Sequence, residues 1–450
     1  MTPTPPVPVT ELRGWAWTCG IYGLCLVLHL AIDVAPERGY ACDCPTRRVL
    51  LYRNNGFRVL AAALAVLAAG GAGGALPPAS DLARCFWPAC RAGCALGLAL
   101  SAALYARGTA RLRAGRIDRG MSCLTASSLD GASGADARPA AARDPAEFDA
   151  RSAAEHFYCG LEWNPRPVWL GGADVKMFNY VVGAVGLAAN VLSAVALHAE
   201  ERERAGVSGG GGGGGFAVSN AMLAYALPML WFVCEYLWCE GVHVYTYDLF
   251  RERTGAKMCW GCWCFYPFFY CVGAWPLVGG GGGAGGGGGG GAASDISAAA
   301  ALACVGLFAC GWLLTRGANL QKHAWRTRPG AADGDGDDDN GKAVWVPLGA
   351  LGPAIAQRTV PGSHGRLLCS GFWGLARHVN YLGEVTQGVA LALPGWLATG
   401  SLAPWAYPAY YAALFVGRQL DDDAACAAKY GAAWDAYCAA VPYHIVPYVW

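Results

Sequence analysis

Nine apolar runs constrain the fold of this chain more than any other feature of its sequence. Each run approaches the ~20 residues that an α-helix needs to cross the hydrocarbon core of a membrane. The runs cover residues 14–32, 59–76, 87–106, 178–197, 221–241, 258–278, 298–315, 383–397 and 403–417. They predict an all-α polytopic integral membrane protein with nine spans, or ten if the aromatic segments hide one more.

Composition agrees with this class. Only 14% of the 450 residues are charged, against about 25% in an ordinary soluble domain. The 18 Trp and 20 Tyr residues suit aromatic belts at the two membrane surfaces. A net charge of +1 provides no general attraction to nucleic acid, so we expect no nucleic-acid partner.

The regions between the runs define the domain organisation. We expect a short N-terminal tail (1–13) without a cleavable signal peptide, followed by one membrane domain (14–450). Residues 107–176 and 329–366 are predicted to be extramembrane loops. The glycine tracts 209–215 and 279–291 are typical of flexible low-complexity spacers.

Basic residues predict the orientation in the membrane. Arg316, Lys322, Arg326 and Arg328 follow the seventh run, and loops rich in Lys and Arg are retained on the cytoplasmic side. If the eighth and ninth runs form a hairpin, the C-terminal tail emerges on that same side.

The cysteines do not indicate a metal site. The densest group, Cys259, Cys262 and Cys264, lies in an aromatic, apolar run, whereas a zinc site usually forms on an ordered polar loop. We therefore expect these residues to be buried apolar side chains. Cys42 and Cys44 could pair with other thiols if their loop is lumenal, and the sequence leaves that open.

Polar side chains gather where the membrane runs end. Glu235 and Glu240, in the fifth run, are functional candidates because acids at membrane depth are costly, or else they pair with a neighbouring helix. Lys322 and Arg326 are four residues apart, so both project from one helical face, where they could bind lipid headgroups or a phosphorylated cofactor. A polar cluster also occupies LLCSGFWGLARHVNYLGE (367–384).

Several motifs resemble the sterol reductase family, which includes delta-14-sterol reductase, 7-dehydrocholesterol reductase and the membrane domain of the lamin B receptor. They are YRNNG (52–56), GLEWNPR (160–166), RGANLQKHAWR (316–326), LLCSGFWGLARHVNYLGE and the tail with DDDAACAAKYGAAWDAYC and VPYHIVPY. The resemblance covers most of the chain. It implies an NADPH-dependent oxidoreductase of the endoplasmic reticulum membrane that reduces a sterol ring double bond during sterol biosynthesis.

The resemblance also implies where the ligands bind. The sterol arrives from the bilayer lipids, while the cofactor pocket lies in the C-terminal half and faces the cytoplasm. No G-x-G-x-x-G follows a strand, so the site is not of the Rossmann type. By motif, the residues expected to contact the cofactor are Lys322, Arg326, Leu368, Trp373, Asn380, Tyr381, Asp422, Cys426, Lys429, Tyr430 and Tyr437, with Lys322 and Arg326 holding phosphate.

Reduction of an isolated C=C bond needs a proton as well as a hydride. Arg418 and Asp422 lie one helical turn apart and match a pair in the family's tail. An Arg neighbour would keep Asp422 ionised, so we expect Asp422 to orient the cofactor, relay a proton or stabilise positive charge on the sterol. Candidates for the proton donor are Tyr245, Tyr247 and Glu240.

The chain departs from the family pattern at three positions. Glu384, Asp421 and His444 replace the usual Asp, Arg and Arg.

The motifs leave alternative functions open. NYLGE and PYHIVPYVW favour the delta-14 branch, and GFWGLARH favours the delta-7 branch. A catalytically inactive sterol-binding homologue and a membrane methyltransferase of the isoprenylcysteine type are further alternatives, although such methyltransferases are shorter and lack NLQKHAWR.

Overall fold

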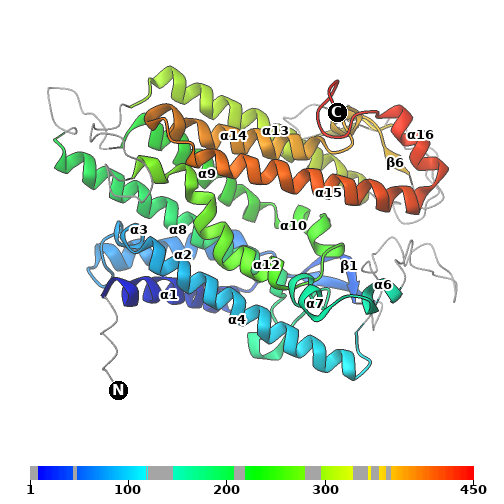
Figure 1. Cartoon of the computed structure of the whole chain (residues 1–450), viewed down its shortest axis with the longest axis horizontal. Coiled ribbons are helices and arrows are strands. Elements are labelled where there is room, and N and C mark those ends of the chain that lie inside the picture. Colours follow the sequence, from blue (N-terminus) through cyan, green and yellow to red (C-terminus); the bar gives the residue numbers. More distant parts are fainter. Residues whose placement is uncertain are drawn as a thin grey trace.

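The computed structural model describes residues 9–43, 48–117, 119, 145–206, 218–278, 295–327, 343–345, 354–360 and 366–450. These parts are mostly helical (Figure 1). The predicted class, an all-α polytopic membrane protein, is confirmed. The glycine tracts 209–215 and 279–291 lie outside the described residues.

The described parts contain fifteen α-helices and three short hairpins. The helices are α1 (Val9–Ala31), α2 (Gly56–Ala72), α3 (Asp81–Arg84), α4 (Phe86–Arg113), α6 (Pro145–Asp149), α7 (Ala153–Cys159), α8 (Val175–Arg204), α9 (Asn220–Trp238), α10 (Glu240–His243), α11 (Tyr247–Phe250), α12 (Ala256–Trp260), α13 (Ala298–Thr327), α14 (Val379–Thr399), α15 (Ala406–Tyr430) and α16 (Ala432–Ala440). The antiparallel hairpins pair β1 (Glu37–Asp43) with β2 (Arg48–Tyr52), β3 (Ala343–Trp345) with β4 (Ala354–Ala356), and β5 (Thr359–Val360) with β6 (Leu367–Leu368).

All nine apolar runs fall on helical segments, but they differ in how well they suit a membrane. Among the described residues, five helical stretches are both long and apolar enough to cross: α1, α4, Val168–Arg204, α9 and α13. α2 is apolar but shorter. The number of spans, unlike the class, therefore stays a prediction.

The sixth run is not a regular α-helix. After α12 the chain forms a π-helix, η2 (Gly261–Phe269), and then the 3-10 turns η3 (Tyr270–Gly273) and η4 (Trp275–Leu277). Pro267, inside η2, has no N–H to donate to an α-helical bond. Such π segments are frequent at functional sites, and this one carries Tyr266 and Tyr270, which line the cavity described below.

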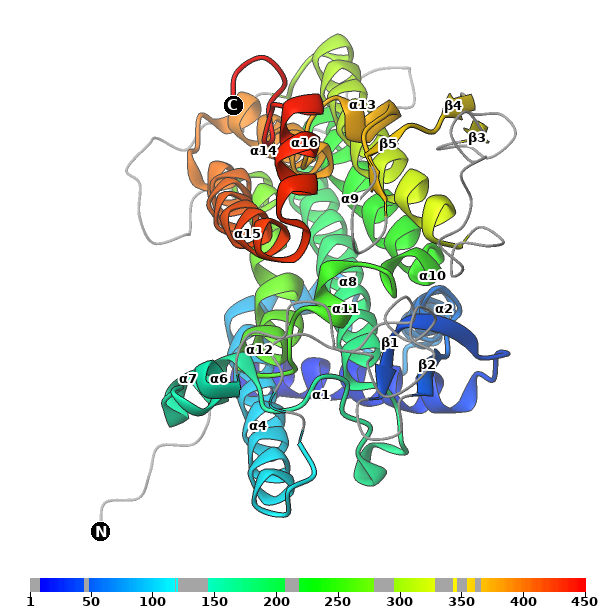
Figure 2. The same ribbon diagram turned by 90° about the vertical axis from the view of Figure 1, so that its right-hand side faces the viewer.

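The helices are arranged around α8 and α9. Helices α1, α2 and α4 lie on one side of them, and α13, α14 and α15 lie on the other, in both views (Figures 1 and 2). Most residues of α8 are buried, as expected of a helix covered on several faces. The resulting core runs from α1 through α8 and α9 to α14 and α15.

Helices α13 and α15 both extend beyond their apolar runs. The apolar run of α13 ends at Thr315, but the helix continues to Thr327, so Lys322 and Arg326 lie on its last turns, on a helix as their four-residue spacing predicts. In the same way α15 runs on to Tyr430 and carries Asp422 and Cys426. Both helices end near α16, at one end of the bundle (Figure 1).

Candidate functional site

A cavity of about 560 Å³ lies where α13, α14, α15 and α16 meet the segment that follows α9. Fourteen of the fifteen residues expected at the site line this cavity: Tyr245, Tyr247, Lys322, Arg326, Leu368, Trp373, Asn380, Tyr381, Arg418, Asp422, Cys426, Lys429, Tyr430 and Tyr437. Glu240 is the exception. Residues distant in sequence are thus brought together by the ends of three long helices.

One end of the cavity is cationic. Lys322 Nζ lies 4.7 Å from the centre of the Trp373 ring, and Arg326 Nη1 donates a hydrogen bond to the Tyr245 carbonyl at 3.0 Å. Trp373 is itself fixed, since its Nε1 donates to the Ala318 carbonyl at 2.8 Å. Two cations one turn apart on α13 can therefore present their charges to one anionic ligand.

Tyr381 forms the centre of an aromatic stack in the cavity wall. Its ring stacks between those of His378 and Phe415, with centroid distances of 5.0 Å and 4.5 Å. Its hydroxyl donates to Asp422 Oδ2 at 3.4 Å. The neighbouring Asn380 Oδ1 is buried and has no hydrogen-bond partner within the protein, so it is an acceptor available to a ligand.

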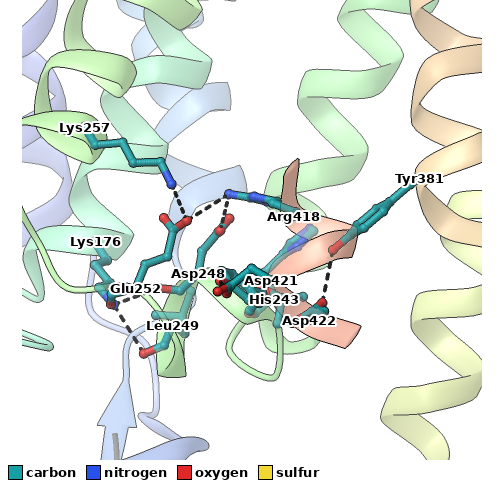
Figure 3. Close-up of polar contacts among 12 residues, drawn as sticks. Lys176, His243, Asp248, Leu249, Glu252, Lys257, Tyr381, Arg418, Asp421 and Asp422 are labelled. Carbon is teal, nitrogen blue, oxygen red and sulfur yellow. Dashed lines mark hydrogen bonds and ion pairs between the residues drawn. The ribbon is translucent and has the colours of Figure 1, made fainter. Parts of the chain in front are cut away.

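The expected Arg418–Asp422 pair does not form. Arg418 Nη2 instead donates to Asp248 Oδ1 at 2.7 Å and Glu252 Oε1 at 3.4 Å (Figure 3). The reason is competition, because two carboxylates from the α11 segment lie closer to the guanidinium. Burial raises the pKa of Asp422, although His378, Lys322 and Arg251 act to lower it.

Lys176 fixes the segment that supplies those two carboxylates. Its side chain is fully buried at the start of α8. Its Nζ donates to the carbonyls of Asp248 at 2.7 Å, Leu249 at 3.3 Å and Glu252 at 2.5 Å (Figure 3). The lysine thereby satisfies carbonyl groups at the end of α11, which otherwise have no helical partner.

The two tyrosines proposed as proton donors have different surroundings. The Tyr247 hydroxyl donates to Asp421 Oδ2 at 2.7 Å, and its ring lies 5.4 Å from the Arg418 guanidinium. Burial and then the Asp421 carboxylate raise the pKa of Tyr247, so the phenol keeps its proton at neutral pH. Tyr245 lies beside Arg326 and His323 at the cationic end.

The two acids of the fifth run have structural partners. Glu235 forms an ion pair with Arg316 of α13, the helix-pairing alternative considered for it. Glu240 Oε2 accepts a hydrogen bond from the Gly56 N–H, at 2.7 Å, at the start of α2. Glu240 is thus buried beside α2 and outside the cavity lining, which removes the geometric basis for its role as proton donor.

Several residues that no motif assigned to the site support its wall. Asp423 accepts from Gln419 at 2.7 Å and pairs with His444 at 3.1 Å, while backbone bonds from Arg377 to Tyr443 and from His378 to His444 dock the C-terminal segment beside the cavity. The proximity of three acids in DDD was a usable signal. The cavity is also lined by Phe232, Tyr236, Tyr266, Tyr270 and Tyr411, which no motif distinguished from ordinary core residues.

The arrangement combines a cationic end with an aromatic, apolar end in one cavity. Such a site can bind a ligand with phosphate groups next to a large apolar one. Within the described parts of the chain, no group of three His, Cys, Asp or Glu side chains is placed to hold a metal ion.

Comparisons with known proteins give the same family as the motifs. The model of the ergosterol biosynthesis ERG4/ERG24 family matches residues 151–450. Delta(14)-sterol reductase TM7SF2 of Mus musculus is 31% identical over 296 residues, which are 65% of this chain and 59% of that protein. Delta(14)-sterol reductase of Dictyostelium discoideum is 31% identical over 291 residues, 65% of this chain and 54% of that protein.

A bacterial protein is similar to the same extent. Delta(14)-sterol reductase of Methylotuvimicrobium alcaliphilum is 30% identical over 294 residues, which are 65% of this chain and 58% of that protein. The chain therefore spans somewhat more than half the length of the curated relatives it matches. The family model covers the cavity-forming helices α8 to α16, and the chain belongs to the ergosterol biosynthesis ERG4/ERG24 family.

Proposed function

We propose that the protein reduces a carbon–carbon double bond in the ring system of a sterol, with NADPH as reductant and the delta-14 bond as its target. The observation that carries this proposal is a cavity whose lining combines the cations Lys322, Arg326 and Lys429 with many aromatic side chains. Membership of the ERG4/ERG24 family and relatives named delta(14)-sterol reductase support the reaction and the bond.

The residues present suit a phosphorylated dinucleotide. Lys322, Arg326 and Lys429 supply positive charge to the cavity wall, and Arg binds phosphate through two parallel N–H groups. The unpartnered Asn380 Oδ1 is an acceptor suited to a carboxamide N–H. When bound, NADPH supplies the hydride, and the protein supplies position and electrostatics.

The protein must supply or pass on the proton that the reduction consumes. We assign the donor to Tyr247, which lines the cavity and whose hydroxyl, held by a hydrogen bond to Asp421 Oδ2, is protonated at neutral pH. Asp422, which accepts from Tyr381 and lines the same cavity, holds or passes a proton. Protonation of an isolated double bond generates positive charge, and the faces of nearby aromatic rings stabilise it.

The apolar end suits a fused hydrocarbon ring system. Side chains of α8, α9, η2 and α15 form this end: Ala184, Leu187, Phe232, Val233, Tyr266, Leu414 and Phe415. Exclusion of water by these residues strengthens the electrostatic effects of the polar groups nearby. We further propose that the protein resides in the endoplasmic reticulum membrane with the cationic end toward the cytoplasm.

A second candidate is reduction of the delta-7 bond, since GFWGLARH resembles that branch. Sterol profiling decides between them. The chain is expressed in a host lacking both ring reductases, and the sterols are separated and identified. Loss of the delta-14 intermediate supports the proposal, loss of the delta-7 intermediate supports the second candidate, and an unchanged profile indicates an inactive homologue or a different reaction.

Cofactor choice is tested with purified protein. We expect activity with NADPH to exceed that with NADH at low concentration, because the 2′-phosphate supplies additional negative charge for the cationic end. Equal rates would contradict the assignment of the phosphate site. Preferential binding of S-adenosylmethionine would instead identify the methyltransferase alternative.

A further inference from the structure

The proposed reaction gives no role to two of the motifs that resemble the family, YRNNG and GLEWNPR. Both motifs stabilise the β1–β2 hairpin. Arg166 of GLEWNPR donates from Nη2 to the Leu51 carbonyl at 2.7 Å, and its guanidinium lies 5.2 Å from the centre of the Tyr52 ring. Tyr52 of YRNNG is buried. A Cβ on Gly39 would approach the Tyr52 Cδ2 atom to 2.6 Å, so the ring of Tyr52 packs directly over Gly39 and would have to move for a larger residue.

The hairpin contains an irregularity that changes the direction of one side chain. Arg38 pairs with Leu51, and Cys42 pairs with Val49. Between these pairs β1 therefore has the three residues 39–41 opposite the single residue Leu50. Such bulges redirect side chains and are frequent beside functional sites.

Successive residues of this bulge have opposite surroundings. Ala41 is fully buried and belongs to a small core with Trp163 of GLEWNPR. Tyr40 instead lines the cavity, consistent with the alternation of side chains along a strand. The hairpin lies next to α10 and α11, the segment that follows α9 (Figure 2).

Tyr40 meets the cation that the proposed function assigns to phosphate. The Arg326 guanidinium lies 4.8 Å from the centre of the Tyr40 ring, and Tyr245, whose carbonyl accepts from Arg326, has its own ring 5.6 Å from that of Tyr40. A ring face attracts a guanidinium and restricts its orientation. Arg326 is therefore held from two directions, by a carbonyl in its plane and by the ring of Tyr40.

We propose that Tyr40 is a positioning residue for anion recognition, in which the β1–β2 hairpin fixes the guanidinium of Arg326 for the 2′-phosphate of the nicotinamide dinucleotide. This inference rests on the proposed function. It adds a contribution from residues 37–43 and 48–52, which precede the segment matched by the family model. It also gives YRNNG and GLEWNPR a role, since both anchor the hairpin.

The test measures binding and kinetics of the full-length purified protein with NADPH and NADH. Tyr40→Ala should raise the Kd and KM for NADPH about tenfold, as expected for the loss of a partly buried cation–π contact. The KM for NADH should change much less, because NADH lacks the 2′-phosphate. Tyr40→Phe, which keeps the ring, should behave like the wild type, and Tyr40→Leu, which keeps bulk without a π face, should behave like Tyr40→Ala even if the alanine variant is unstable.

A double-mutant cycle identifies the partner through which Tyr40 acts. If Tyr40 works through Arg326, the Tyr40→Leu/Arg326→Ala protein should bind NADPH no more weakly than Arg326→Ala alone. Additive losses, or equal losses for NADPH and NADH, would overturn the proposal. Tyr158→Ala, at an exposed tyrosine outside the cavity lining, is the control. Failure of the wild-type protein itself to bind NADPH would contradict the proposed function before any substitution is made.

Discussion

The Asp422 carboxyl group lies in a part of the cavity wall where burial opposes its ionisation. Burial raises its pKa despite the nearby His378 and Lys322, and its Oδ2 accepts a hydrogen bond from Tyr381. We expect Asp422→Asn to lower kcat about a hundredfold or more, because an amide preserves the hydrogen bond but cannot exchange a proton. Steady-state oxidation of NADPH in the presence of sterol measures this effect.

The comparison for this variant is Asp435→Asn. Asp435 is exposed on α16 and does not line the cavity, so its substitution should leave kcat unchanged. Normal turnover in Asp422→Asn would remove Asp422 from the mechanism and direct attention to Glu384, another acid of the cavity lining.

Lys322 provides the second prediction about a single residue. Its ammonium group lies over the Trp373 ring at the cationic end. Lys322→Met should raise the KM for NADPH about ten- to a hundredfold, the effect of losing one charged hydrogen bond, with little change in the KM for sterol. Lys257→Met is the matched control, since Lys257 pairs with Glu252 at 2.6 Å outside the cavity lining. An unchanged KM for NADPH together with weaker membrane insertion would indicate a lipid-anchoring role.

Single residues also mark how far the sequence could predict the site. The motifs predicted that Lys322 and Tyr381 belong to the site, because a family resemblance assigns a role to each residue at a matching position. The partner of Arg418 was predicted wrongly, since its spacing from Asp422 permits an i,i+4 pair whereas Asp248 and Glu252 approach from a distant segment. Nothing in the sequence indicated a role for Tyr40, because its contact with Arg326 depends on a β-bulge that the sequence does not reveal.

At the scale of elements, Glu240 connects α10 to the start of α2. Burial raises the pKa of this carboxyl group to about 8, although the Gly56 N–H opposes the shift. The folded protein therefore retains a proton that the unfolded chain releases above pH ~4.5, and stability declines as pH rises from there to about 8. Glu240→Gln keeps the acceptor for Gly56 and does not titrate.

We consequently expect the melting temperature of Glu240→Gln to exceed that of the wild type by several degrees at pH 8.5 and to match it near pH 5. Thermal unfolding in detergent at the two pH values measures the difference. Turnover should stay within about twofold of the wild type, because Glu240 lies outside the cavity lining. A large loss of turnover would restore Glu240 as a proton donor.

The ends of helices were harder to predict than their centres. Hydropathy located the apolar middle of α13 and α15, but both helices continue through charged residues to Thr327 and Tyr430. These extensions carry side chains that line the cavity. The helix continues there because of the surroundings of these side chains and not because of their hydropathy. The π-helix of η2 also had no periodic signature, and its run was predicted as an ordinary membrane span.

At the scale of the whole molecule, the position of the cavity predicts the topology. The cationic residues of α13 and α15 and the helix α16 lie at one end of the bundle, whereas α3 lies at the other (Figure 1). If the cationic end faces the cytoplasm, the segment between α2 and α3 faces the lumen. The sequence contains no N-x-S/T acceptor of its own, so introduced glycosylation sites report on topology without background.

We expect an Asn-x-Thr acceptor in a short flexible insert after Gly74, an exposed position beyond α2, to be glycosylated in endoplasmic reticulum membranes. The same insert after Gly431, between α15 and α16, should remain unmodified, because the transferase acts in the lumen. Sensitivity of the mobility shift to endoglycosidase identifies the glycan, and sterol reduction by each inserted protein verifies its fold. The reverse pattern would place the cationic end in the lumen, away from cytoplasmic NADPH, and would contradict the proposed orientation while leaving the chemistry of the cavity intact.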